Sequence, residues 1–352
     1  MKHPKLVNGP WFLKDLKSGK LGAPKLNKKV LSCFCCGGGS TMGYKLAGYD
    51  VLGGVEIDPE MQNIYVKNHN PKYMFKMGVG DFNKLPREKI PDELFDLDIL
   101  DGSPPCSSFS MAGSREKKWG VEKKFREGQA KQVLDDLFFT FIETAKLLQP
   151  KVVVAENVKG LIQGNARGYV KEIFKGLKDA GYDNVQLFLL NSSKMGVPQR
   201  RERTFFVANR LGKKLKLDFD EKEISVLEAF SSIEKINYKG KDYSKSSMVK
   251  YWEQCLPGES FSKYHPKGSL FGQTKLPKHK PVGTLTSKDY QYWSNETPRG
   301  LSKHECFILQ SYPQDYLVKN DAEAKYICGM SVPPFMTQRL SLEIYKQILH
   351  GK

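Results

Sequence analysis

Three consecutive glycines at positions 37–39 constrain the fold of this chain more than any other feature. They lie between an apolar run at 30–34, which predicts a buried strand, and a predicted helix over 40–47 whose first residue, a serine, is the expected N-cap. A second strand is predicted over 49–55 and ends at Glu56. This order is typical of a nucleoside site, because glycine lets the backbone approach a ligand and the acid accepts from ribose hydroxyls. The alternative is a tight turn without a ligand.

The alternation of strands and helices continues to residue 208. Strands are predicted over 94–100, 152–154, 185–190 and 204–208, and helices over 133–148 and 169–178. The pattern favours an α/β fold built on a doubly wound, mostly parallel sheet. Asp81, a further acid between these elements, is a candidate acceptor for an adenine amino group.

Cys106 follows the strand predicted over 94–100. Pro104 and Pro105 stop that strand, because neither can donate to a ladder and each fixes its own φ. Glu156 follows the strand predicted over 152–154 and is expected at the same sheet edge, where ligands collect in open α/β sheets. The alternative for the cysteine is a buried structural thiol.

The charge of the chain indicates a polyanionic partner. Lys and Arg number 56 against 39 Asp and Glu, a formal net charge of +17, which favours nucleic acid over a merely basic surface. Residues 114–126 mix basic and aromatic side chains, as in a flap over a phosphate backbone or in a solvated loop.

The apolar segments and the cysteines indicate the cellular compartment of the protein. No run of 18 apolar residues and no apolar secretory region occurs, so neither a membrane span nor a signal peptide is predicted. Seven cysteines, an odd number, favour reduced thiols in the cytoplasm, and no metal site is predicted.

Three regions are expected from composition. Residues 1–29 form a basic arm docked by Trp11, Phe12 and Leu13, and residues 30–215 together with 325–352 form the sheet domain. Residues 216–324 form a smaller, basic and loop-rich domain with a hinge, with a helix over 224–233. A structural helper is the alternative to a substrate-reading role for this domain.

Methyl transfer to a pyrimidine carbon is the reaction that needs this set of groups. Cytosine C5 is a poor nucleophile, and a Cys106 thiolate that attacks C6 makes C5 enamine-like. Protonated Glu156 can donate to N3, where charge builds. A base inside a duplex must be flipped out to be reached.

The motifs that carry these residues resemble those of the DNA (cytosine-5)-methyltransferases. Residues 105–110 match Pro-Cys-x-x-Phe-Ser, residues 156–158 match Glu-Asn-Val, and residues 199–203 match Gln-x-Arg-x-Arg. The resemblance extends from Val30 to the C-terminus. It implies a Rossmann-like class I methyltransferase domain with a target-recognition domain at about 226–280.

The resemblance also implies site residues. Cys106 is then the nucleophile, Glu156 the partner of N3, and Arg201 and Arg203 the supports of the flipped base. The residues expected to line the S-adenosylmethionine pocket are Phe34, Gly37, Gly39, Glu56, Ile57, Asp81, Phe82, Pro105, Leu137, Ser331 and Val332.

The implied partner is duplex DNA, with a cognate restriction endonuclease possible in the same system. A monomer in the cytoplasm of a bacterial or phage-infected cell is expected. Two positions depart from the family pattern, because Cys36 replaces a glycine and Met330 an asparagine, which bears on cofactor affinity. A tRNA cytosine-5 methyltransferase and a catalytically inactive DNA-binding paralogue remain as alternatives, and the cysteine after Pro105 disfavours an amino-methyltransferase.

Overall fold

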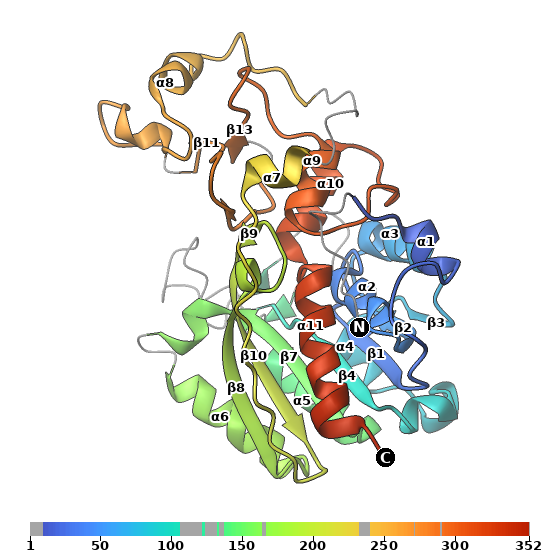
Figure 1. Cartoon of the computed structure of the whole chain (residues 1–352). Coiled ribbons are helices and arrows are strands. Elements are labelled where there is room, and N and C mark those ends of the chain that lie inside the picture. Colours follow the sequence, from blue (N-terminus) through green and yellow to red (C-terminus); the bar gives the residue numbers. More distant parts are fainter. Residues whose placement is uncertain are drawn as a thin grey trace. The chain divides into compact units, whose positions relative to one another are not determined.

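The structure is a computed structural model of the chain (Figure 1). In it the chain forms two compact units. It describes residues 10–105, 122–123, 132–133, 137–163, 167–231, 240–270, 272–288 and 291–351. Unit 1 comprises Met1–Gly22, Asn191–Arg201 and Phe219–Met336, and unit 2 comprises Ala23–Leu190, Glu202–Asp218 and Thr337–Lys352. Compactness does not assign a function to either unit, so the functional domains expected from the sequence stay a prediction.

Unit 2 contains a seven-stranded sheet in the order β3-β2-β1-β4-β7-β10-β8 (Figure 1). The strands are β1 (Lys29–Cys33), β2 (Asp50–Val55), β3 (Tyr73–Phe75), β4 (Ile99–Gly102), β7 (Val152–Val158), β8 (Asn184–Asn191) and β10 (Glu202–Asn209). The pairs β1–β2, β1–β4, β2–β3 and β4–β7 are parallel, and β10 is antiparallel to β7. The strand order reverses between β1 and β4, where open α/β sheets bind ligands. The predicted fold class is confirmed.

Helices cover both faces of this sheet. They are α2 (Gly39–Leu46), α3 (Pro59–His69), α4 (Val79–Phe82), α5 (Leu137–Leu148), α6 (Arg167–Asp179) and α11 (Pro334–Ile344), which continues as a π-helix over Tyr345–Leu349. Leu31 and Cys33 of β1 belong to the apolar core shared with α5 and α6. Since side chains alternate across a strand, Ser32 faces the opposite side, toward α2. On that side Tyr49 donates to the Ser341 carbonyl of α11 at 2.8 Å.

Several predicted boundaries are wrong. The strand expected over 94–100 is β4 at Ile99–Gly102, because the chain after Pro91 first forms a 3₁₀ helix over Asp92–Phe95. Asp98 is then used as an acceptor, for the Lys29 amide at 2.9 Å. The helix expected over 133–148 is α5 (Leu137–Leu148), and Val133 lies in a short strand over Gln132–Val133 instead.

The N-cap of α2 is also different from the expectation. Gly38, with φ of 78°, occupies that position instead of Ser40. Ser40 lies inside the first turn of the helix, and its hydroxyl donates to Asp101.

In the described residues of unit 1, the strands are very short and helices predominate. Its helices are α1 (Leu13–Lys17), α7 (Val226–Ser231), α8 (Val249–Gln254), α9 (Lys303–Leu309) and α10 (Asp321–Met330). Its two-residue strands are β9 (Gln199–Arg200), which pairs with β12 (Val282–Gly283), and β11 (Thr274–Lys275), which pairs with β13 (Tyr292–Trp293). Two further short strands of the chain, β5 (Glu122–Lys123) and β6 (Gln132–Val133), pair with each other.

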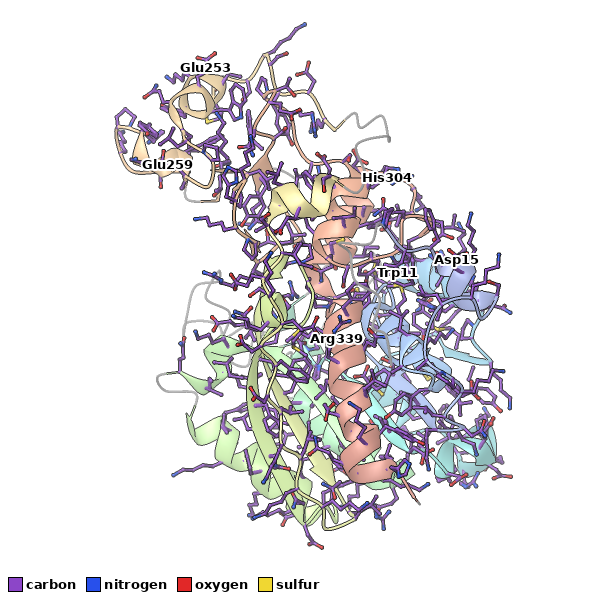
Figure 2. The ribbon with its side chains drawn as sticks, viewed as in Figure 1. Trp11, Asp15, Glu253, Glu259, His304 and Arg339 are labelled. Carbon is purple, nitrogen blue, oxygen red and sulfur yellow. The ribbon has the colours of Figure 1, made fainter. Side chains whose placement is uncertain are left out.

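The N-terminal arm is anchored by a tryptophan within unit 1 (Figure 2). Trp11 is buried, donates its indole N–H to the Ser311 carbonyl at 3.0 Å and stacks on Phe335. Leu13 is also buried, and its amide donates to Asp315. Among the described helices, none has the length and apolar character needed to cross a membrane.

Candidate active site

The turn after β1 is held in an unusual backbone conformation. Phe34, Cys36 and Gly38 have φ of 52°, 46° and 78°, all in the left-handed region that favours glycine. A Cβ on Gly38 would lie 2.1 Å from Nε2 of His69. Gly38 is therefore required by the fold itself, through its φ and through the adjacent imidazole. Gly37 and Gly39 complete the turn and start α2.

Glu56 is the acceptor around which this turn closes. Its Oε2 accepts from the Cys36 amide at 2.8 Å, and its Oε1 accepts from the amides of Ile57 and Asp58, both at 2.9 Å. Burial raises the pKa of the Glu56 carboxyl, and the three amides act against that rise. A carboxylate has about four acceptor sites, so Oε2 retains one for a ribose hydroxyl. The turn and acid therefore fit a nucleoside cofactor.

The other predicted pocket residues of unit 2 divide into two groups. Ile57 and Asp81 flank Gly78, where an added Cβ would lie 3.5 Å and 3.4 Å from their side chains. Phe82 is fully buried and packs edge-on against Phe75, which gives its ring a structural role.

Three further predicted pocket residues lie on or beside α5 and β4. Phe34 packs against Phe141 of α5, with ring centroids 6.5 Å apart. Leu137 is the first residue of α5, and Pro105 lies three residues after the end of β4.

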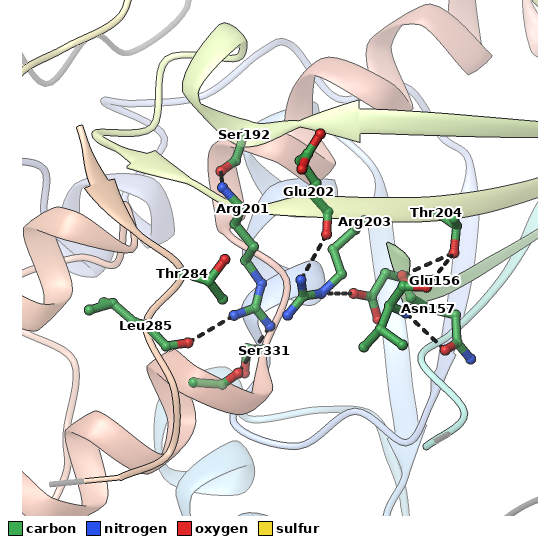
Figure 3. A network of polar contacts seen from close by, with 12 residues as sticks. Glu156, Asn157, Ser192, Arg201, Glu202, Arg203, Thr204, Thr284, Leu285 and Ser331 are labelled. Carbon is green, nitrogen blue, oxygen red and sulfur yellow. Dashed lines mark hydrogen bonds and ion pairs between the residues drawn. The ribbon is translucent and has the colours of Figure 1, made fainter. Parts of the chain in front are cut away.

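Glu156 and Arg203 form a largely buried ion pair, with 11% and 13% of their side chains exposed (Figure 3). Arg203 Nε lies 3.0 Å from Glu156 Oε1, and β7 and β10 place the pair because Arg203 is opposite Val158 in their antiparallel register. Burial lowers the pKa of the Arg203 guanidinium, and the Glu156 carboxylate opposes that change. The predicted acid thus has a fixed cationic neighbour.

Asn157 ties the end of β7 to the segment that leads into Cys106. Its Nδ2 donates to the Pro104 carbonyl at 3.1 Å, and its Oδ1 accepts from the Val158 amide at 2.8 Å. Cys106 itself lies outside the described residues, as does most of the predicted flap over 114–126. The structure therefore brings Glu156, Arg203 and the strand before Cys106 together within unit 2.

Arg201, Ser331 and Val332 belong to unit 1. The Arg201 guanidinium donates to the carbonyls of Leu285 at 3.2 Å and Gly329 at 3.0 Å (Figure 3). The Ser331 carbonyl accepts from Gln310 at 2.8 Å. The contacts of Arg201 thus hold segments of unit 1 together, and its expected role beside the base stays a prediction.

One buried carboxylate at the sheet edge, that of Asp101, was not expected from the sequence. Burial raises its pKa to about 6, although hydroxyl groups of Ser40, Ser32 and Tyr44 donate to it and oppose the rise. The only signal in the sequence is an acid at the end of a predicted strand, and its partners depend on the strand register.

The sheet order, the glycine turn with its acid and the paired glutamate at the end of β7 define a doubly wound α/β protein with a nucleoside-type site. The model of one protein family, described as C-5 cytosine-specific DNA methylase, matches residues 28–346. The chain belongs to this family, which confirms the resemblance inferred from the motifs.

Several curated relatives of the chain are named type II methyltransferases. M.FnuDI of Fusobacterium nucleatum is 32% identical over 235 residues, covering 67% of this chain and 59% of the relative. M.NgoPII of Neisseria gonorrhoeae is 32% identical over 54% of this chain and 50% of the relative. The match thus spans little more than half the length of these two. M.MthTI of Methanothermobacter thermautotrophicus is 25% identical over 92% of this chain and 98% of the relative.

Solved structures share the fold. A protein described as a DNA modification methyltransferase encoded within an E. coli prophage has a TM-score of 0.67 at 20% identity, covering 92% of this chain and 100% of that one. A DNMT2 variant of Spodoptera frugiperda has a TM-score of 0.61 at 16% identity, covering 91% and 100%. At these identities the likeness concerns the fold alone.

Proposed function

We propose that this protein transfers a methyl group from S-adenosylmethionine to C5 of a flipped-out cytosine in a specific sequence of duplex DNA. The observation that carries the proposal is the buried Glu156–Arg203 pair beside the strand that leads into Cys106. Family membership and the relatives named as type II methyltransferases support it. S-adenosylmethionine, when bound, supplies an activated methyl group.

The chain's own residues account for the activation of the base. The Cys106 thiolate forms a bond to C6, and the electron pair displaced from the ring is neutralised by a proton delivered to N3 from Glu156. C5 can then attack the methyl group. Loss of the C5 proton to a base, cleavage of the C6–sulfur bond and return of the N3 proton to Glu156 regenerate the thiolate and restore the aromatic ring.

The Arg203 guanidinium positions the carboxyl that serves N3. It contacts Oε1 of Glu156 and also donates to the Glu202 carbonyl at 2.8 Å, so it is held at both sides. The remaining carboxyl oxygen is the one available to the base. Asn157 donates to the carbonyl of Pro104, two residues before the nucleophile, and so fixes the backbone from which the chain continues to Cys106.

The turn after β1 and Glu56 are the proposed seat of the cofactor's adenosine. The free acceptor site on Glu56 Oε2 takes a ribose hydroxyl, and Asp81 takes the adenine amino group. Phe34, Gly37, Gly39, Ile57, Phe82, Pro105 and Leu137 complete the part of the proposed pocket that belongs to unit 2.

The domain expected over residues 216–324 is the proposed DNA-reading domain, and its residues 240–288 lie within unit 1. They contain nine lysines and three acids, and a small aromatic core of Tyr251, Phe261 and Trp293 organises them. Because the lysines outnumber the acids, the net charge of these residues is strongly positive. Glu259, one of the acids, pairs with Lys263. Lysines set against phosphates make binding salt-dependent.

Labelled S-adenosylmethionine offered with plasmid DNA and with tRNA tests the reaction. Label is expected in DNA only, and bisulfite sequencing should place it at C5 of cytosine in one sequence context. Cys106→Ser should abolish turnover while S-adenosylhomocysteine still binds. Label in tRNA alone, or full turnover by Cys106→Ser, would overturn the proposal.

Salt dependence tests the DNA-reading domain. Replacing the exposed Lys245 and Lys250 with alanine should weaken DNA binding and lower the slope of log affinity against log salt by roughly 2. Alanine at Lys171 and Lys175 of α6, which are equally exposed, is the matched control. An unchanged slope in the first pair would remove residues 240–288 from the interface.

A further inference from the structure

The Asp101 carboxylate joins three elements at the edge of the sheet. Ser32 Oγ of β1 and Ser40 Oγ of α2 donate to Oδ2 at 2.8 Å and 2.7 Å, and Tyr44 OH donates to Oδ1 at 3.3 Å. Ser32 and Asp101 are opposite each other in the parallel register of β1 and β4. Ser40 immediately follows the glycine turn. These contacts therefore link the turn after β1 to the strand that leads toward Cys106.

A carboxylate is a costly way to make this link. Asp101 is 5% exposed, and among the described residues it has no ion-pair partner. Burying an unpaired charge is unfavourable, and apolar side chains would hold two strands and a helix together without that cost. Buried charges of this kind are found where a site needs them.

A neighbouring contact between α2 and α3 is made without any charged group. One residue after Ser40, Thr41 of α2 meets Tyr65 of α3 through a hydroxyl pair 2.9 Å apart, and no carboxylate is involved. This neutral contact fixes α2 against α3, which lies on the same side of the sheet. The contacts with the carboxylate come from Ser40, which adjoins the glycine turn, and from Tyr44, one helical turn further along α2.

We propose that Asp101 is a positioning residue for the methyl donor. Its ionised carboxylate draws the hydroxyls of Ser32 and Ser40 onto one oxygen and thereby sets the glycine turn relative to the end of β4. The turn seats the donor, and Cys106 follows Asp101 by five residues, so one group aligns both halves of the reaction. This inference rests on the proposed function.

The protonation of Asp101 gives the proposal its own signature. Around the carboxylate lie Cys33 of β1, Tyr44 of α2, Tyr65 of α3 and Glu156 of β7. Burial raises the pKa of each of the first three groups, so they stay neutral near pH 6. A change of donor affinity near pH 6 that depends on residue 101 is therefore assigned to Asp101.

Calorimetric titration of the full-length protein with S-adenosylhomocysteine tests the proposal. Asp101→Asn should bind about tenfold more weakly at about pH 8, the loss expected when charge-assisted hydrogen bonds disappear. At about pH 5 the wild type should weaken to within roughly twofold of the variant. Ser40→Ala should bind more weakly at pH 8, whereas the matched control Tyr65→Phe should bind like the wild type.

The outcomes separate this inference from the proposed function. A wild type that binds no S-adenosylhomocysteine contradicts the proposed cofactor, whatever Asp101 does. If the wild type binds and Asp101→Asn binds equally well at pH 8, the positioning role is refuted. An equal loss at both pH values would make the role merely structural and would also refute it. Should Asp101→Asn fail to fold by circular dichroism, Ser40→Ala against Tyr65→Phe decides.

Discussion

The ionised carboxylate of Asp101 should lower the stability of the folded protein at neutral pH. Burial raises its pKa from an ordinary value of 3.8 to about 6. An acid whose pKa is higher in the folded state binds protons more tightly there, so stability falls as the pH rises from about 4 to about 6 and stays low above that. A rise of about two pKa units corresponds to about 3 kcal/mol.

Asp101→Asn should remove this penalty. Asparagine is neutral and of the same shape, so at about pH 8 the variant should unfold at a temperature several degrees higher than the wild type. At about pH 4.5 the difference should shrink to about a third of its value at pH 8, because the carboxyl is then protonated in the folded state but still largely ionised in the unfolded state. The pKa of Glu56 is raised in both proteins, and its contribution cancels in the difference.

Scanning calorimetry from pH 4.5 to pH 8 measures that difference. A variant that melts below the wild type at pH 8 would show that the three hydroxyl contacts outweigh the burial of the charge, and the reasoning would fail. A pH-independent difference would also contradict it. Higher stability combined with weaker donor binding is the combination expected of a residue retained for function at the expense of stability.

Three further predictions concern other parts of the fold. Gly38→Ala should destabilise the protein by more than about 2 kcal/mol, since its Cβ would strike an imidazole, whereas Gly212→Ala, at a similar φ with open space, should cost about 1 kcal/mol in the same denaturant titration. Glu156→Gln should lower kcat by about 10²-fold or more and leave Arg203 unpaired, at a stability cost of about 3 kcal/mol, while unchanged kcat would refute its role. Arg299→Lys should lose one branch of a bidentate ion pair and about 1–2 kcal/mol, and an unchanged melting temperature would contradict this.

Much of the sheet could be predicted from the sequence, because buried parallel strands are short apolar runs. The run at 30–34, the β-branched triplet at 152–154 and the glycines between strand and helix mark β1, β7 and the turn within a few residues. The family could be read from the motifs at 105–110 and 156–158. Each of these signals is local.

The misses have physical causes that are not local. The antiparallel direction of β10 depends on how the chain returns after β8, and no short pattern encodes that. The helix α3 is the exception, because its start signal is local: Asp58 precedes Pro59 and accepts from two amides of the first turn. The Asp101 contacts needed the register that places Ser32 opposite it.

Three carboxylates at this sheet edge are stabilised by three different kinds of donor. Glu56 after β2 is held by backbone amides, Asp101 in β4 by hydroxyls, and Glu156 in β7 by the Arg203 guanidinium. Backbone amides are fixed in position by the fold, so Glu56 is suited to a fixed hydrogen bond with a ligand. Hydroxyl groups rotate and can act as donor or acceptor, so Asp101 can change protonation without leaving its partners unsatisfied. Removing either side chain of the Glu156–Arg203 pair leaves the other without its partner. The acid expected to contact the reacting base is thus the one whose position depends on a second charged side chain, and the steps of binding, alignment and proton transfer fall to different residues.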